Sequence, residues 1–181
     1  MKKKSYWTYL VDSFERDLSA ISWWVNSSGF HQDDKVCLLP LKELSLKFIF
    51  EERPDFIVWN YARNNNIKFI KLAKYLNIYN IVHDTEGIHY ETNTYFNIQN
   101  RYLKYIDEIW CWGGEQAKYL KTKFKNNKIK PLIKVTGSIR YEYIKTLHKV
   151  NLQENIGKLL WNTNYATLDP RFQTVFREYR E

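Results

Sequence analysis

The residues with the clearest capacity for chemistry form one short run, His83-Asp84-Thr85-Glu86-Gly87, which follows an apolar segment. Two neighbouring carboxylates repel each other, and partial burial raises the pKa of one of them further. A carboxyl group tuned in this way can accept a proton from an attacking hydroxyl. The run therefore predicts an acid–base group, and the alternative is an aspartate that caps a loop beside a solvated glutamate.

A metal site is the less favoured interpretation of the same run. Asp84 and Glu86 could share a divalent cation with a diphosphate, but the sequence offers no obvious third protein ligand. Cys37 and Cys111 both lie in apolar, strand-like runs, so we predict core residues in a reducing compartment. We therefore predict no metal, no disulfide and no cofactor.

Glycines mark two further places where a ligand could approach the backbone. Gly113 and Gly114 precede a helical pattern, and the N–H groups of such a first turn can hold an anion, although plain turn chemistry explains them equally. Gly137, Ser138 and Arg140 follow a later apolar run. The chain has neither the GxGxxG pattern nor the GxxxxGK[ST] pattern, which leaves dinucleotide and P-loop sites unsupported.

The elements that must position these residues alternate regularly along the chain. Short apolar runs are separated by amphipathic segments, a pattern typical of β-α-β units. We predict a Rossmann-like α/β fold with a parallel sheet of about six strands and helices on both faces. The carboxyl ends of parallel strands share one edge, which would bring the candidate residues together. The predicted strands are 6–11, 36–39, 56–59, 78–82, 108–112 and 132–135, and the predicted helices include 18–25, 41–50, 66–76 and 95–105.

The alternation of apolar runs and amphipathic segments changes near the C-terminal end. Residues 145–156 are typical of a helix or linker, and 158–164 form one more strand-like run. One strand cannot make a domain. We therefore predict a first domain over 1–145, followed by 146–181 as a linker and the stub of an absent or truncated second domain.

Composition narrows the classes of protein to which this chain can belong. The 181 residues are 44% hydrophobic, which is enough for a packed core, and no window of about 18 apolar residues suggests a membrane span. The formal net charge of +8 indicates either a lysine-rich solvated surface or a surface that faces nucleic acid or an anionic membrane. We expect a cytoplasmic protein.

Three runs, in this order, resemble a known family. PDFIVWNYARNNNIKFIKLAKYLNIYNIVHDTEG, YIDEIWCWGGEQAKYL and IKVTGSIRYE are similar to bacterial surface carbohydrate biosynthesis proteins of the GT-B glycosyltransferase type and, more distantly, to the UDP-GlcNAc 2-epimerase fold. The resemblance extends over about residues 55 to 170. Ser138-Ile139 replaces Asn-Pro and Glu142 replaces Asp, which weakens the last motif.

The resemblance implies the N-terminal, acceptor-side half of a glycosyltransferase for surface polysaccharide such as capsule or O-antigen. Glu86 would be the catalytic base, with Asp84 as second choice. The substrate, a nucleotide-sugar, would need no cofactor. Substrate and phosphate contacts would come from His83, Gly87, Gly113, Gly114, Gly137, Ser138 and Arg140.

The implied partners are a separate donor-binding domain or chain, a glycan or lipid-linked acceptor, and the inner face of the cell membrane, but no nucleic acid. Because catalysis needs both reactants in one cleft, the chain alone would be inactive. Two other functions stay open, namely a non-catalytic carbohydrate- or partner-binding scaffold module and an epimerase-like nucleotide-sugar enzyme.

Overall fold

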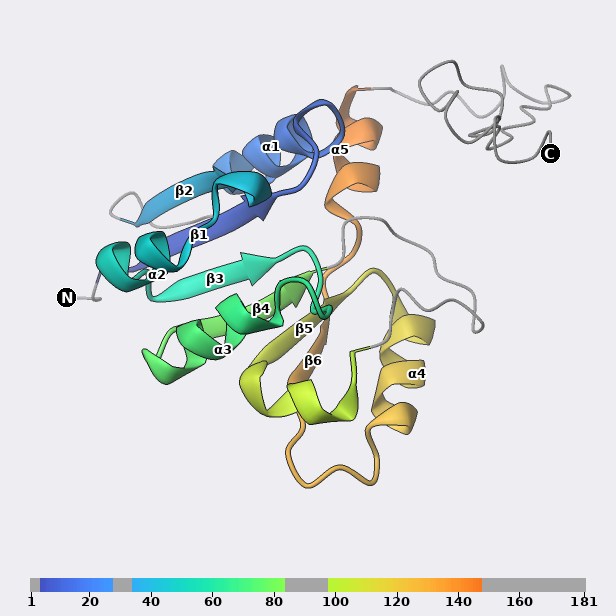
Figure 1. The fold of residues 1–181 in the computed structure, drawn as a ribbon. Coiled ribbons are helices and arrows are strands. Elements are labelled where there is room, and N and C mark those ends of the chain that lie inside the picture. The colour runs from blue at the N-terminus through green and yellow to red at the C-terminus, as the bar shows by residue number, and fades with distance from the viewer. Residues whose placement is uncertain (1–3, 28–33, 84–97, 148–181) are drawn as a thin grey trace, which may run out of the picture. The chain divides into compact units, whose positions relative to one another are not determined.

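The computed structural model describes residues 4–27, 34–83 and 98–147, which form an α/β domain around a six-stranded parallel sheet (Figure 1). The strand order is β2-β1-β3-β4-β5-β6, and every neighbouring pair is parallel. The order of the first five strands is the flavodoxin-like doubly-wound order, with β6 added at one end. The predicted Rossmann-like class is confirmed. The strands are β1 (Tyr6–Val11), β2 (Lys35–Pro40), β3 (Phe56–Trp59), β4 (Tyr79–His83), β5 (Glu108–Cys111) and β6 (Leu132–Val135).

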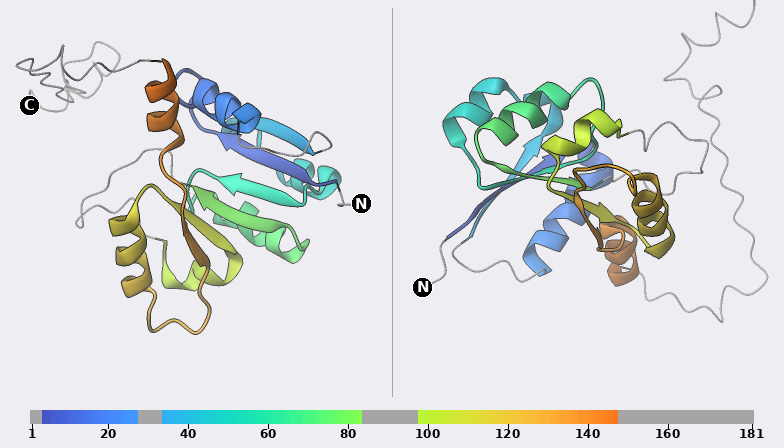
Figure 2. Two further views of the ribbon diagram at one scale, coloured as in Figure 1. Left: turned by 180° about the vertical axis from the view of Figure 1, so that it is seen from behind. Right: turned by 90° about the horizontal axis from the view of Figure 1, so that it is seen from below.

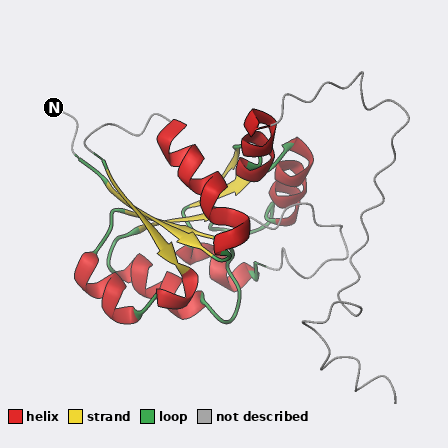
Figure 3. Ribbon diagram, turned by 90° about the horizontal axis from the view of Figure 1, so that it is seen from above, coloured by secondary structure: helices red, strands yellow, loops and turns green. Residues whose placement is uncertain are grey.

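Helices cover both faces of the sheet (Figure 2, Figure 3). The chain steps from β1 to β2 in one direction and from β3 to β6 in the other, so right-handed crossovers put α1 on the opposite face from the later connections. The helix α5 joins α1 on its face. The helical elements are η1 (Phe14–Leu18, a π-helix), α1 (Ser19–Ser27), η2 (Leu41–Glu43), α2 (Leu46–Glu52), α3 (Ile67–Tyr75), η4 (Asn100–Tyr105), α4 (Gly114–Lys123) and α5 (Ile139–Leu147).

The larger core lies between the sheet and α2, α3, η4 and α4. Trp59 and Ile57 of β3, Ile109 of β5, Ile70 of α3 and Leu120 of α4 are all buried there. These strands are apolar on both faces because helices cover both, which explains why their sequences appear as unbroken apolar runs.

Asn80 is a buried polar residue at the centre of this core. Its Oδ1 accepts a hydrogen bond from Trp59 Nε1 at 2.9 Å, and its Nδ2 donates to the carbonyls of Ile70 at 3.1 Å and Tyr105 at 2.9 Å. The Asn80 side chain therefore joins β3, β4, α3 and the end of η4.

The second core lies under α1 and α5 and is largely aromatic. Tyr9 of β1 and Trp110 of β5 both contact Trp24 edge-on, with ring centroids 5.9 and 5.5 Å away. Ile21 of α1 and Ile139 of α5 complete the layer.

Two predicted helices differ from the structure. The segment 41–50 divides because Ser45 Oγ accepts the N–H of Phe48 at 3.0 Å and starts α2 late, after the short turn η2. In the described part of 95–105, the chain forms the 3-10 helix η4 and not an α-helix. A third difference concerns the predicted helix or linker over 145–156: α5 begins earlier, at Ile139, because Ser138 caps it and its Oγ accepts the N–H of Tyr141 at 3.2 Å.

Contacts divide the chain into units 1–148 and 149–181. The second unit lies outside the described residues, so the predicted linker and stub over 146–181 stay a prediction. None of the helices in the described ranges is both long and apolar enough to span a bilayer.

Candidate functional site

The sequence-predicted residues divide into two groups. Asp84, Glu86 and Gly87 lie outside the described residues, so their predicted roles stay predictions. The others follow the neighbouring strands β4, β5 and β6, and the structure brings them to the same carboxyl edge of the sheet. They are His83, Gly113, Gly114, Gly137, Ser138 and Arg140.

His83, the last residue of β4, is 1% exposed. Its Nδ1 lies 2.7 Å from the hydroxyl of Tyr9, and its Nε2 makes no hydrogen bond of good geometry in the described ranges. Burial lowers the pKa of His83 to about 4, against a smaller opposing effect of a weak hydrogen bond to the backbone of Gly137. The imidazole is therefore neutral at pH 7.

Tyr9 determines which nitrogen of His83 carries the hydrogen. Burial, and then the charge of Asp17, raise the pKa of the Tyr9 phenol far above its usual range, so the hydroxyl stays protonated. Because Nδ1 is its described partner, we assign the hydroxyl as donor to Nδ1, which leaves the ring hydrogen on Nε2. His83 is then an uncharged donor at the edge of the sheet.

Asp17 lies behind Tyr9 and is fully buried in the π-helix η1. Its Oδ1 accepts a hydrogen bond from Arg16 Nε at 3.0 Å, and its Oδ2 accepts one from the N–H of Ser13 at 3.3 Å. Buried charge is tolerated only where it is paired and hydrogen-bonded in this way. Asp17 acts on the Tyr9 phenol through its charge, and Tyr9 in turn contacts His83.

Asn60 follows β3 directly and is 2% exposed, yet neither Oδ1 nor Nδ2 has a partner among the residues that the structure describes. Trp59 pairs with Val82, so Asn60 comes beside His83 in the register, and strand alternation puts both on the face of α1 and α5. Buried side-chain polar groups are nearly always hydrogen-bonded. The Asn60 amide beside His83 therefore indicates a place that a ligand would complete.

The first turn of α4 adds backbone donors to this edge. Gly113 is its N-cap and makes no side-chain cap hydrogen bond, and a Cβ at Gly113 or Gly114 would meet nothing within 4 Å. Gln116 Oε1 accepts the N–H of Trp112 at 2.6 Å, which holds the turn but leaves the first N–H groups of the helix without acceptors in the helix. Such a turn carries a partial positive charge that favours anions.

The turn before α5 is fixed against β5. The N–H groups of Thr136 and Gly137 donate to the carbonyl of Cys111 at 2.9 and 3.2 Å, and Gly137 has a φ of 84°. That conformation favours glycine, because a Cβ there meets its own backbone. This turn holds the Gly137 backbone near His83.

We expect Gly137→Ala to lower the free energy of unfolding by about 1–2 kcal/mol, because alanine strains a backbone of positive φ. Gly113→Ala is the matched control, since Gly113 is extended with a φ of −163° and has open space around it. It should leave stability unchanged or slightly raised. Urea unfolding compares the two, and equal effects would mean that the Gly137 turn relaxes without strain.

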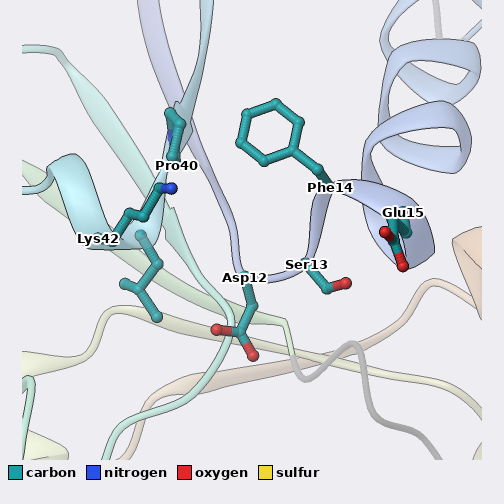
Figure 4. A pocket seen from close by; sticks show the side chains of 7 residues that line it. Asp12, Ser13, Phe14, Glu15, Pro40 and Lys42 are labelled. Atoms are coloured by element: carbon teal, nitrogen blue, oxygen red, sulfur yellow. The ribbon is translucent and has the colours of Figure 1, made fainter. Parts of the chain in front are cut away.

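A separate hollow of about 460 Å³ lies beyond the ends of β1 and β2 (Figure 4). Its lining contains one lysine and two carboxylates, and one of these, Asp12, pairs with Arg16 at 3.5 Å. Its charges therefore do not favour an anion, unlike those near His83. In the described ranges no three acidic, histidine or cysteine side chains gather to hold a metal ion. The hollow is lined by Asp12, Ser13, Phe14, Glu15, Pro40, Leu41 and Lys42.

Comparisons with known proteins assign no family to the chain. No protein-family model matches the chain, and no curated protein matches it. The structure matches a signal receiver domain from Vibrio parahaemolyticus at 10% identity and a TM-score of 0.35, over 87% of this chain and 100% of that one. So low a similarity transfers no activity or site to this chain.

The predicted family is therefore wrong, and with it the assignment to GT-B glycosyltransferases, nucleotide-sugar chemistry and surface polysaccharide biosynthesis, because no family model and no curated relative supports it. The physical reason is that the resembling runs consist largely of the alternating strands and helices of an α/β domain. Any parallel α/β sheet requires such runs. The donor-binding chain and the glycan acceptor depended on that assignment.

Sequence reasoning singled out none of Tyr9, Asp17 and Asn60. The alternation of β1 was available as a signal for Tyr9, whose side chain shares a face with that of Val11. Nothing in the local sequence marks Asp17 as buried, because it lies in a charged segment, Glu15-Arg16-Asp17.

Proposed function

We propose that this domain binds a small anionic ligand, one that carries a phosphate or carboxylate group, at the carboxyl edge of β3 to β6. The observation that carries the proposal is the buried Asn60 amide, which has no hydrogen-bond partner among the described residues and lies beside His83 at the edge where helix first turns also lie. In open parallel sheets, ligands bind beyond the carboxyl ends of the strands.

The donors at this edge suit an anion. Neutral His83 offers one N–H without competing for a proton at pH 7, and the Asn60 amide offers two more. The open first turn of α4 adds backbone N–H groups. Arg140, in the first turn of α5, contributes a guanidinium whose planar fork matches a phosphate or carboxylate. The net charge of +8 attracts such ligands to the domain.

Asn60→Leu tests the proposal, because the substitution removes the amide and keeps most of the volume. We expect inorganic phosphate to bind the variant about tenfold more weakly than the original protein, since a good hydrogen bond to a charged group is worth roughly 1.5–3 kcal/mol. The unliganded variant should be more stable by about 1 kcal/mol, because an unpaired buried amide is replaced by an apolar group. Calorimetric titration gives the first quantity and urea unfolding the second.

Asn126→Leu is the control, because Asn126 is exposed and follows α4 at the far end from Gly113. It should leave phosphate affinity unchanged. If Asn60→Leu binds phosphate as tightly as the original chain, or loses stability, the amide is a structural group and the proposed site is wrong.

A further inference from the structure

One segment of the chain is rich in lysine and poor in acidic residues. Residues 114–135 contain seven lysines and one acidic residue, Glu115, whereas the net charge of the whole chain is +8. The segment comprises α4, the connection 124–131 and β6, the outermost strand of the described sheet on that side. We call it the basic edge. Its lysines are Lys118, Lys121, Lys123, Lys125, Lys128, Lys130 and Lys134.

Five of these lysines are exposed and form no ion pair with any residue in the described ranges. They are Lys118, Lys121, Lys125, Lys128 and Lys130. Of the remaining two, Lys134 pairs with Glu108 at 2.8 Å, and Lys123 is half-buried near the ring of Tyr119. The basic edge therefore keeps most of its charge available to a partner.

Exposed apolar side chains lie among these lysines. Tyr119 is 41% exposed, Ile129 58%, Leu132 52% and Val135 57%. Ile129 stands directly between Lys128 and Lys130. Leu132 and Val135 belong to a strand with one unpaired edge, where natural proteins usually avoid exposed apolar residues unless a partner covers them.

We propose that the basic edge binds the surface of an anionic lipid bilayer. Lysines that approach such a surface are attracted by its negative potential, and their effects accumulate. The apolar side chains between them can enter the boundary between headgroups and acyl chains, as they do on amphipathic surfaces that lie on membranes. The lysines and apolar side chains that carry this proposal do not belong to the anion site, which shares only the first turn of α4 with the basic edge.

The composition of the basic edge favours lipid over nucleic acid as the partner. The segment contains no arginine, although arginine is the usual residue for bidentate contacts to phosphates and bases. Three of its four exposed apolar side chains are aliphatic and cannot stack on bases, whereas single-stranded nucleic acids bind mainly through aromatic stacking. Charge combined with exposed aliphatic groups matches a bilayer.

Co-sedimentation of the whole chain with vesicles tests this inference. We expect binding to vesicles of phosphatidylcholine with about 30% phosphatidylserine, little binding to pure phosphatidylcholine, and weaker binding as salt is raised. Failure to bind the anionic vesicles would overturn the proposal, as would tighter binding to a single-stranded oligonucleotide in the same buffer.

A matched pair of variants separates the basic edge from bulk charge. Lys125→Glu with Lys128→Glu should weaken binding to anionic vesicles about tenfold or more. Lys47→Glu with Lys68→Glu makes the same change in net charge on α2 and α3 and should weaken it far less. Equal losses in the two pairs would overturn the proposal.

Ile129→Ser provides a second readout that does not change charge. It should reduce the binding that persists at high salt, where the electrostatic part is screened, and leave thermal unfolding unchanged because Ile129 is exposed. Unchanged high-salt binding would mean that no apolar group at this position enters the bilayer, which would overturn that part of the inference.

Discussion

Asn80→Leu is expected to lower the free energy of unfolding by about 4 kcal/mol. The Asn80 side chain satisfies Trp59 Nε1 and the carbonyls of Ile70 and Tyr105, and all three groups lose their partner when leucine replaces it. Each buried group left unpaired costs roughly 1–3 kcal/mol, and the extra apolar burial of leucine offsets part of the sum.

Asn60→Leu is the natural comparison, because both asparagines are almost fully buried and adjoin neighbouring strands. The same chemical change should destabilise at position 80 and stabilise at position 60, since only the first amide has partners in the described structure. Urea unfolding at pH 7 measures both. A loss below about 1 kcal/mol for Asn80→Leu would show that water replaces its hydrogen bonds.

Acid should destabilise this domain through His83. Its pKa is lowered to about 4 in the folded state from the ordinary value of 6.5 for a solvated histidine. The unfolded chain therefore takes up the proton first as pH falls, so the stability that neutral His83 contributes is complete above about pH 6.5 and is lost progressively toward pH 4. The difference between the folded and unfolded pKa of His83 corresponds to a loss of about 3 kcal/mol in the free energy of unfolding across that pH range.

His83→Gln removes the titrating group and retains a side chain that can hydrogen-bond to Tyr9. The dependence of unfolding free energy on pH between 7 and 4 should therefore be flatter in this variant by about 3 kcal/mol. Urea unfolding at several pH values gives the comparison, and the NMR titration of the His83 ring gives its pKa directly. A ring that titrates near 6.5 would contradict the burial argument.

The strands were predictable from sequence because burial on both faces leaves an unmistakable trace. The run FIVW was predicted and observed over the same residues, Phe56–Trp59. The predicted 132–135 is β6, although this edge strand is largely exposed. The first residue of a helix was harder to predict where a single side chain fixes it. Ser45 and Ser138 each cap a helix, and a capping serine cannot be told from other serines in the sequence.

The candidate site was predictable only in part. Parallel strands place the residues that follow them along one edge, so His83 and Gly137 could be assigned to that edge without coordinates. The contact between Tyr9 and His83 could not, because it joins residues 74 apart in the chain and depends on the order of the strands between them. The family resemblance failed for a related reason, since local runs report burial and turns more than function.

The position of β1 between β2 and β3 has a consequence for how the protein is made. A chain emerging from the ribosome exposes β1 first, but its second neighbour, β3, is not synthesised until Phe56–Trp59. During that interval one side of an apolar strand has open backbone groups that can pair with another nascent chain. Slow translation before β3 should therefore favour aggregation, whereas a pause after it should not.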